Sequence, residues 1–296
     1  MTQFNGIYPA VATPMDAEGA LNEAALRQVL EFNIRAGVQG FWLAGGSGES
    51  ILLEDDENKR IAQIAADQSK GRAVNIMHIG AATTKRTVRL AEHAARAGVE
   101  AICCVPPFFY GRSDEEIVEY FRSVGAAADL PLFVYNLPSS TRVEITTDLI
   151  SKIQDRVPQL AGLKHSSPNF ANIRAFAEMG LSCFTGSCAL MLPGLTIGAC
   201  GAIDGPPNAA PEAWVAIWNA YQKGDLPAAI AAQQHATQTA SVFRHYGFHA
   251  SLKAVLSHRL GVDCGAPRLP ALPLTLEQRQ DVIARAEAIG LHRVTL

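Results

Sequence analysis

The sequence predicts an α/β fold, a (β/α)8 TIM barrel with a C-terminal helical extension. From Gly6 to Asp204, short and nearly continuous apolar segments alternate with longer amphipathic segments. Such strands are typical of a parallel sheet buried on both faces, and eight of them favour a closed barrel. An open doubly wound sheet is the competing fold, but it would need a glycine-rich dinucleotide loop after an early strand, and the sequence has none.

The predicted strands are apolar and end near glycine or proline, which is the usual boundary of a buried strand. They cover residues 6–13, 39–44, 74–80, 101–105, 132–136, 160–164, 181–186 and 200–204. Helices are predicted between them at residues 22–36, 55–67, 84–97, 114–127, 147–155 and 169–178, with a short one near 189–198. Asn22 is the expected N-cap of the first helix, because its side chain can accept a hydrogen bond from a free backbone N–H.

The pattern becomes purely helical after Pro211. Helices are predicted at residues 212–222, 226–243, 251–260 and 276–289. No internal repeat or low-complexity linker is present, so a single domain is expected. We assign residues 1–224 to the barrel and residues 225–296 to a C-terminal helical extension of the same domain.

The uncharged stretch at residues 180–203 requires a test for a membrane span. A spanning helix needs about 20 continuous apolar residues, whereas this stretch is interrupted by glycine, proline and hydroxyl side chains, among them Gly186, Pro193 and Gly201. A buried strand, a short helix and a second buried strand fit better. No membrane association is therefore expected.

The composition excludes further classes of function. Lys and Arg number 25 against 28 Asp and Glu, which gives a net charge of −3 without a long basic run, so nucleic-acid binding is not expected. The first residues, MTQFNG, lack a cationic segment followed by an apolar one, so no secretory signal is expected. The six cysteines lie in apolar segments without zinc-site spacing. They are expected to be buried free thiols of a cytoplasmic protein.

Chemistry in a barrel of this kind belongs at the C-terminal ends of the strands. The second strand is followed there by GGSGES, residues 45–50. Its glycines leave backbone N–H groups unobstructed, which suits a carboxylate or phosphate. The segment is no P-loop, because no Gly-Lys-Ser/Thr follows, and Glu49 replaces the last glycine of a nucleophile elbow. Taken alone, it is equally compatible with an ordinary tight turn.

Two residues near the ends of neighbouring predicted strands indicate covalent chemistry. Lys164 ends one apolar strand, where a buried amine favours its neutral, nucleophilic form. Its alternative is a lysine at the mouth of the strand that reaches into solvent. Tyr135 alone would be a packing aromatic. Together they suggest an imine-forming site, because Schiff-base chemistry needs a proton shuttle that a phenol can supply.

These motifs resemble one known family. GGSGES, YNLPSS (135–140) and GLKHSS (162–167) follow in this order on the second, fifth and sixth predicted strands. They are similar to the motifs of the dihydrodipicolinate synthase / N-acetylneuraminate lyase family of class I aldolases. The resemblance runs from G-x-x-x-A-x-x-T-P at residues 6–14 to GAPRLP at residues 265–270, and so covers nearly the whole chain.

The resemblance implies a (β/α)8 barrel, a homotetramer with a helical C-terminal extension, no metal or organic cofactor, and a pyruvate-type 2-oxo acid as substrate. Lys164 matches the Schiff-base lysine and Tyr135 the catalytic tyrosine. Gly46 and Ser47 match the pair that binds the 2-oxo acid carboxylate, and Ser47 also stands in the proton relay. Ile203 matches the residue whose backbone lies beside the pyruvyl group.

The chain departs from the synthases at two positions. Phe109 stands where they carry a tyrosine that reaches into the neighbouring subunit's proton relay, and Tyr110 beside it could supply the hydroxyl instead. Ser140 stands where they carry an arginine that recognises the carboxylate of the aldehyde substrate. Arg142 could serve instead, with a side chain that points differently. Both changes disfavour the lysine-biosynthesis reaction.

The chain also departs from the sialic-acid lyases. Their Asp-Glu pair for sugar hydroxyls aligns with Cys188 and Ala189, and their serine after the eighth strand aligns with Gly205. Loss of three polar partners leaves little to bind a polyhydroxylated chain. His165 and Asp204 are candidates for the second-substrate pocket. Alternatively, His165 is a solvated residue at the rim, and Asp204 is a carboxylate that caps a loop.

We therefore expect an enzyme, a carbon–carbon or carbon–oxygen lyase of the class I aldolase type. It would form an imine between Lys164 and a 2-oxo acid, and then make or break a C–C bond or dehydrate a 2-oxo sugar acid. A 4-hydroxy-tetrahydrodipicolinate synthase or N-acetylneuraminate lyase proper is the alternative within the family. A silent barrel acting as a ligand-binding or regulatory protein is the alternative of another class, against which Lys164, Tyr135 and Ser47 argue.

Overall fold

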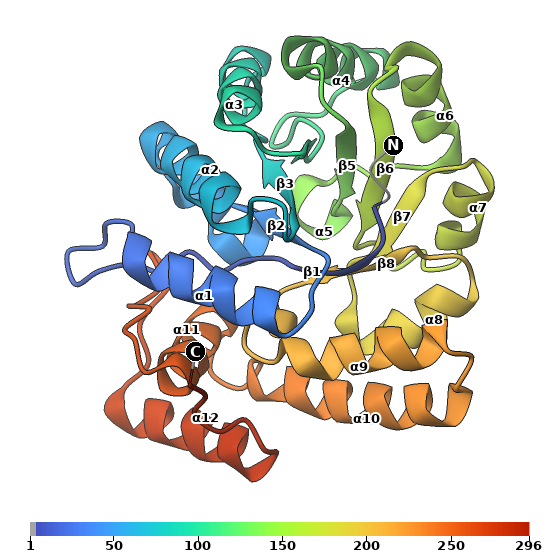
Figure 1. Cartoon of the computed structure of the whole chain (residues 1–296). Helices are drawn as coiled ribbons and strands as arrows, with labels where there is room; N and C mark the ends of the chain where they lie inside the picture. Colours follow the sequence, from blue (N-terminus) through green and yellow to red (C-terminus); the bar gives the residue numbers. More distant parts are fainter. Residues whose placement is uncertain (1–3, 296) are drawn as a thin grey trace.

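The computed structural model describes residues 4–295 and contains eight parallel strands surrounded by helices (Figure 1). The strands are β1 (Gly6–Pro9), β2 (Gly40–Leu43), β3 (Val74–His78), β4 (Ala101–Cys104), β5 (Leu132–Asn136), β6 (Leu160–His165), β7 (Ser182–Thr185) and β8 (Gly201–Asp204). Each strand pairs with its sequence neighbour from β2 to β8, and β8 pairs with β1. A parallel bridge between Ala10 and Trp42 links β1 to β2. The predicted TIM barrel is confirmed.

The helices follow the strands around the barrel. They are α1 (Glu23–Arg35), α2 (Asp55–Ser69), α3 (Thr84–Ala97), α4 (Asp114–Ala128), α5 (Pro138–Thr141), α6 (Thr147–Arg156), α7 (Asn172–Glu178), α8 (Met191–Thr196) and α9 (Pro211–Gln222). Asn22 caps α1 as predicted, because its side chain accepts a hydrogen bond from the Ala25 N–H. The short helix α5 was not predicted, because four residues are too few to show a helical period.

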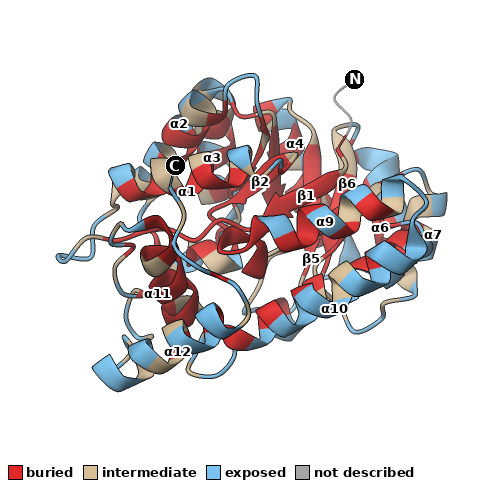
Figure 2. Cartoon of the chain, turned by 60° about the horizontal axis from the view of Figure 1, so that its bottom comes forward, coloured by how far each residue is buried: buried red, intermediate tan, exposed pale blue. Residues whose placement is uncertain are grey.

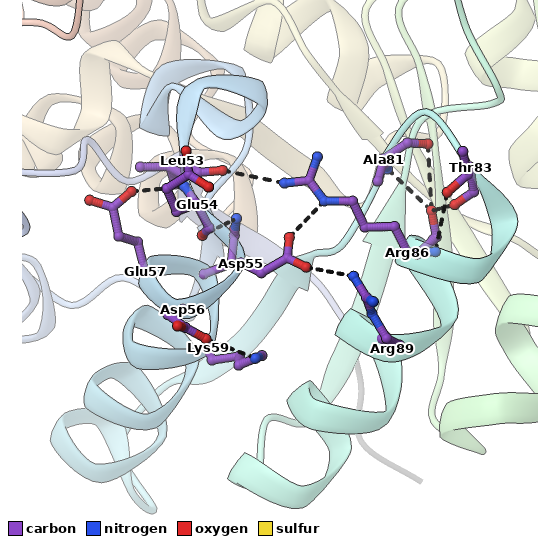
Figure 3. Close-up of polar contacts among 12 residues, drawn as sticks. Leu53, Glu54, Asp55, Asp56, Glu57, Lys59, Ala81, Thr83, Arg86 and Arg89 are labelled. Carbon is purple, nitrogen blue, oxygen red and sulfur yellow. Dashed lines mark hydrogen bonds and ion pairs between the residues drawn. The ribbon is translucent and has the colours of Figure 1, made fainter.

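Adjacent helices are also joined by ion pairs on the outer surface. The Asp55 carboxylate, in the first turn of α2, lies 2.6 Å from Arg86 and 2.9 Å from Arg89, both on α3 (Figure 3). An acidic residue at this place also interacts favourably with the positive end of the helix dipole. These contacts fix the position of α2, and the loop that precedes α2 carries the GGSGES motif.

The core forms two layers, as expected for a barrel. Inside the barrel, large side chains from most of the strands pack together, including Tyr8, Trp42, Phe133, Phe184 and Ile203. The outer layer lies between strands and helices and is made mostly of aliphatic side chains. Figure 2 shows this arrangement as buried strands and inner helix faces beneath exposed outer faces. The interior of the barrel is therefore filled by side chains.

The glycine of the GLK motif has a packing reason. A Cβ on Gly162 would lie 2.2 Å from the Ser182 carbonyl oxygen and 2.8 Å from the Phe133 ring. Only glycine therefore fits where β6 lies between β5 and β7. Gly162 pairs with Phe133 across β6 and β5, two positions before Lys164 pairs with Tyr135.

The uncharged stretch at residues 180–203 forms β7, α8 and β8, as predicted. In the part of the chain that the structure describes, no helix is both long and apolar enough to cross a membrane.

The C-terminal part contains α10 (Leu226–Val242), α11 (Phe248–Leu260) and α12 (Leu276–Ala288). Helix α9 packs against β1 and α10, while α11 packs against α12 and α1. The predicted boundary between residues 224 and 225 falls in the turn between α9 and α10, where Gly224 has a φ of +74°. Helix α11 begins three residues earlier than predicted and brings Phe248 and His249 toward the C-terminal rim of the barrel.

Candidate active site

A cavity of about 280 Å³ opens at the C-terminal rim of the barrel. Its wall includes Gly46 from the GGSGES loop, His78 from β3, Tyr135 from β5, Ser140 from α5 and His249 from α11. Two larger hollows are also present: one lies beside α3 and α4 and shares Phe108 with this cavity, and the other lies between α1 and the C-terminal segment. The cavity at the rim is the one that contains predicted site residues, so we describe it as the candidate site.

Lys164 and Tyr135 lie together beside this cavity. Residues 135 and 164 are direct partners across β5 and β6. The Lys164 Nζ lies 4.4 Å from the centre of the Tyr135 ring and 5.5 Å from that of the Trp42 ring. Lys164 is 4% exposed and Tyr135 6%. The alternative of a lysine that reaches into solvent is therefore wrong, and the amine lies in a mostly apolar, aromatic environment.

The GGSGES loop approaches the same pair. Gly46 begins a short 3-10 turn, and a Cβ at Gly46 would lie 3.8 Å from the Tyr135 hydroxyl oxygen. The backbone of this loop and the phenol thus line the cavity, and the Lys164 amine lies against the phenol ring. Backbone N–H groups at such a turn can bind the carboxylate of a substrate whose next carbon faces Lys164.

Ser47 and Ile203 are not part of the described cavity wall. Ser47 is half-buried, and its Oγ would lie 2.7 Å from a Cβ at Gly205, so the loops after β2 and β8 meet there. Ile203 is fully buried on β8 inside the barrel. Phe248 would lie 2.2 Å from the same Cβ at Gly205, so this position has no room for a serine side chain.

Tyr110 lies outside the cavity of its own chain. Tyr110 is 66% exposed and Phe109 86%, and their rings pack edge to face with centroids 4.9 Å apart. Phe109 has a φ of +78°, a left-handed conformation that is costly for a bulky residue. Within the described residues, Val105 and Phe108 of this loop line the cavity, and Phe109 and Tyr110 do not. In this structure of the single chain, Tyr110 is therefore not part of the described cavity wall.

Arg142 is exposed and follows α5 in a left-handed conformation, with a φ of +62°. In residues 4–295, the neighbours Ser140 and Thr141 line the cavity and Arg142 does not. The chain therefore presents a hydroxyl, and no guanidinium, at this part of the wall.

The prediction that His165 belongs to the second-substrate pocket is wrong, and so is the alternative of a solvated rim residue. Its ring lies between β6 and α7, edge-on to Phe176 with centroids 5.3 Å apart. One ring nitrogen lies 3.1 Å from the Asn136 amide and the other 3.0 Å from the Asn169 carbonyl oxygen. Burial lowers the pKa of His165. Side chains alternate along a strand, so the residue after the inward Lys164 points outward.

Asp204 has the loop-capping role. One carboxylate oxygen accepts a hydrogen bond from the Cys188 N–H at 2.9 Å, and the other from the Gly205 N–H at 2.7 Å. The first contact joins the loops after β7 and β8, and the second caps the backbone directly after β8. Asp204 therefore shapes the rim rather than offering a free carboxylate to a substrate.

His78 was missed by the sequence analysis. It is buried, lines the cavity and lies edge-on to Tyr135 with ring centroids 6.3 Å apart. Burial lowers its pKa to about 4, the nearby Lys164 acts in the same direction, and a hydrogen bond to the Ala44 carbonyl opposes both. The imidazole is therefore neutral at pH 7. A histidine near the end of a predicted inward-facing strand was the available signal.

His78 should make stability depend on acid pH. The unfolded chain takes up a proton on this side chain below about pH 6.5, whereas the folded chain does so only near pH 4. The contribution of the neutral His78 side chain to the free energy of unfolding is thus fully present above pH 6.5 and is lost as the pH falls toward 4. The free energy of unfolding, measured with urea, should fall between pH 7.5 and pH 4.5 by about 3 kcal/mol less in His78→Gln than in the parent. Parallel pH profiles for the parent and the variant would contradict this.

His249 was also missed. Its Nε2 lies 2.9 Å from the Gly46 carbonyl oxygen, although the two residues are 203 positions apart. The C-terminal extension thereby contributes a wall of the cavity and contacts the loop expected to bind the carboxylate. No local pattern in the sequence signals such a contact.

The site is built for covalent chemistry by an amine. Among residues 4–295, no group of three or more His, Cys, Asp and Glu side chains is placed to hold a metal ion. A buried lysine beside a phenol and a glycine-rich turn, at the rim of a (β/α)8 barrel, is typical of one class of protein, the Schiff-base-forming barrels.

Comparison with known proteins agrees with this class. The model of the dihydrodipicolinate synthetase family matches residues 3–289. An uncharacterised DapA-like lyase of Halobacterium salinarum is 32% identical over 290 residues, which cover 97% of this chain and 95% of that protein. The N-acetylneuraminate lyase of Escherichia coli is 29% identical over 295 residues, 99% of each. YagE of E. coli K12, solved in complex with pyruvate, superposes with a TM-score of 0.92 at 26% identity, covering 98% and 100% of the two chains.

The chain therefore belongs to the dihydrodipicolinate synthase family. It is a lyase of the pyruvate-type class I aldolases, as the resemblance implied.

Proposed function

We propose that Lys164 forms a Schiff base with a small 2-oxo acid. The observation that carries this proposal is the buried Lys164 amine against the Tyr135 ring, with the GGSGES backbone beside the phenol hydroxyl. The amine attacks the 2-oxo carbon, and loss of water gives a protonated imine. The imine accepts the electron pair of the C3–C4 bond when that bond breaks, and the enamine that results is protonated at C3.

Tyr135 would move the protons of these steps. Its hydroxyl lies at the loop that would hold the carboxylate and its ring at the amine, so one phenol can serve both the carbinolamine oxygen and the departing group. The backbone of Gly46 and Ser47, with the Ser47 hydroxyl, would bind the carboxylate and fix the reacting carbon over Lys164. The Ile203 backbone would lie beside the pyruvyl group.

The second substrate is expected to be small. A cavity of about 280 Å³ lies just below the range usual for ligand sites. Cys188 is buried, and Phe248 fills the space that a serine at position 205 would need. These features argue against sialic acid, and the exposed Arg142 argues against aspartate semialdehyde. Deoxy sugar acids or hydroxylated 2-oxo diacids fit better, with Ser140 and His249 as their polar partners in the wall.

A side-by-side comparison of kcat/KM values tests this substrate range. The missing arginine contact is worth about 1.5–3 kcal/mol and the missing relay hydroxyl at least a factor of about ten. We therefore expect condensation of pyruvate with aspartate semialdehyde to be slower by several orders of magnitude than in a dedicated synthase. A value near about 10⁴ M⁻¹s⁻¹ for that substrate, ordinary for a physiological one, would contradict the proposal. Turnover of none of these substrates would instead favour the silent binding protein.

The assembly is proposed to be a homotetramer. Ile51, Phe109 and Tyr110 are 65%, 86% and 66% exposed in the single chain, and apolar side chains in such numbers near one rim favour contact with another copy. Such contact would also bring the Tyr110 hydroxyl to a neighbouring site. Light scattering should give four times the chain mass of 31.6 kDa, and a monomer would exclude this arrangement. The six unpaired thiols support a cytoplasmic protein.

A further inference from the structure

One buried ion pair lies outside the proposed reaction steps. The Lys253 Nζ on α11 lies 2.6 Å from the Glu49 Oε1 of the GGSGES loop, and the two side chains are 1% and 2% exposed. Lys253 also donates a hydrogen bond to the Ala266 carbonyl at 2.9 Å. The second carboxylate oxygen of Glu49 accepts one from the Arg268 N–H at 2.5 Å. The Glu49 carboxylate is thus held by two residues of the C-terminal extension.

The backbone at Glu49 needs such a support. Glu49 has a φ of +63° in the left-handed region, which costs a non-glycine residue roughly 1 kcal/mol. Its N–H closes the 3-10 turn by donating to the Gly46 carbonyl at 3.1 Å. The conformation of Glu49 therefore determines where the amides of Gly46 and Ser47 point.

Burial makes the pair sensitive to loss of one partner. Removing one charge of a buried ion pair leaves the other without compensation, whereas removing both is much better tolerated. Burial lowers the pKa of Lys253, and the Glu49 carboxylate opposes this effect. A free charge in this place would draw in water and let the loop move.

We propose that the Glu49–Lys253 ion pair is a positioning device, through which the C-terminal extension holds the GGSGES loop in the shape that binds the substrate carboxylate. This inference rests on the proposed function, because it assumes that the loop binds the carboxylate of the 2-oxo acid bound to Lys164. Neither residue touches the reacting atoms. The extension is thereby part of the binding site.

The test is a double-mutant cycle with pyruvate as the probe. The full-length parent, Glu49→Gln, Lys253→Met and the double variant are incubated with increasing pyruvate and borohydride, and the reduced adduct is quantified by intact mass. Each single variant should raise the half-saturating pyruvate concentration roughly ten- to hundred-fold, with adduct formation at saturation within about three-fold of the parent. In the double variant, the half-saturating pyruvate concentration should rise by less than the product of the two single-variant increases. It should still be higher than in the parent.

A control separates positioning from general stability. Glu212→Gln removes the partner of Arg259, which lies on the same helix α11 at 2.8 Å from Glu212, away from the loop. It should leave the half-saturating concentration unchanged. Single variants that lower the unfolding midpoint but bind pyruvate like the parent would overturn the inference, since the pair would then be only structural.

The outcomes also distinguish this inference from the proposed function. A parent protein that traps no pyruvate would overturn both. A parent that traps pyruvate, with pyruvate dependence unchanged in the variants, would overturn the positioning role alone. Where a single variant does not fold, the double variant decides, and a half-saturating concentration equal to that of the parent would overturn the inference.

Discussion

Lys164→Ala is expected to abolish turnover and the borohydride-trapped adduct while the protein stays folded. Lys164 is buried at the end of β6, facing Tyr135 and Trp42, so without its amine no carbonyl carbon in the cavity can form an imine. Turnover with 2-oxo acids and intact mass after reduction measure the effect, and circular dichroism reports the fold.

The exposed Lys70 offers a matched control. Lys70→Ala should behave as the parent in both measurements. More than a trace of activity in Lys164→Ala would show that the imine forms on another amine, and the assignment of the site would then fail.

Tyr135→Phe is expected to lower the rate by roughly 10² to 10⁴. The ring would remain packed edge to face with Trp42, at 5.5 Å between centroids, so the change removes the hydroxyl and little else. Single-turnover measurements should show slower imine formation and slower C–C bond cleavage, because both steps need the same proton carrier.

Tyr120 provides the comparison for Tyr135. It is also buried, but its hydroxyl lies 3.1 Å from the Thr87 hydroxyl in the layer between helices and strands. Tyr120→Phe should change the rate by no more than a few-fold. A Tyr135→Phe variant as fast as the parent would reduce Tyr135 to a packing residue.

The fold could be predicted because its signals are local. Apolar strands and amphipathic helices alternate at a regular spacing, and each strand emerges close to its predicted place. The position of Lys164 beside Tyr135 followed from neighbouring strands whose ends meet at one rim. The outward direction of His165 could also have been predicted from the sequence, since side chains alternate along a strand.

Other parts of the site depend on contacts between distant segments. The His249 contact with Gly46 joins residues 203 positions apart. The Glu49–Lys253 pair likewise joins the GGSGES loop after β2 to α11. A single sequence contains no periodicity that links such segments. The exposed position of Tyr110 could not be predicted from the sequence either, because it follows the left-handed backbone at Phe109.

The most direct test of the central claim is to trap the imine and locate it. The parent protein is incubated with pyruvate, reduced with borohydride, digested and analysed by mass spectrometry. One reduced pyruvyl group per chain is expected, on the peptide that contains Lys164 and on no other lysine. An unmodified protein, or a pyruvyl group found on a different lysine, would contradict the account.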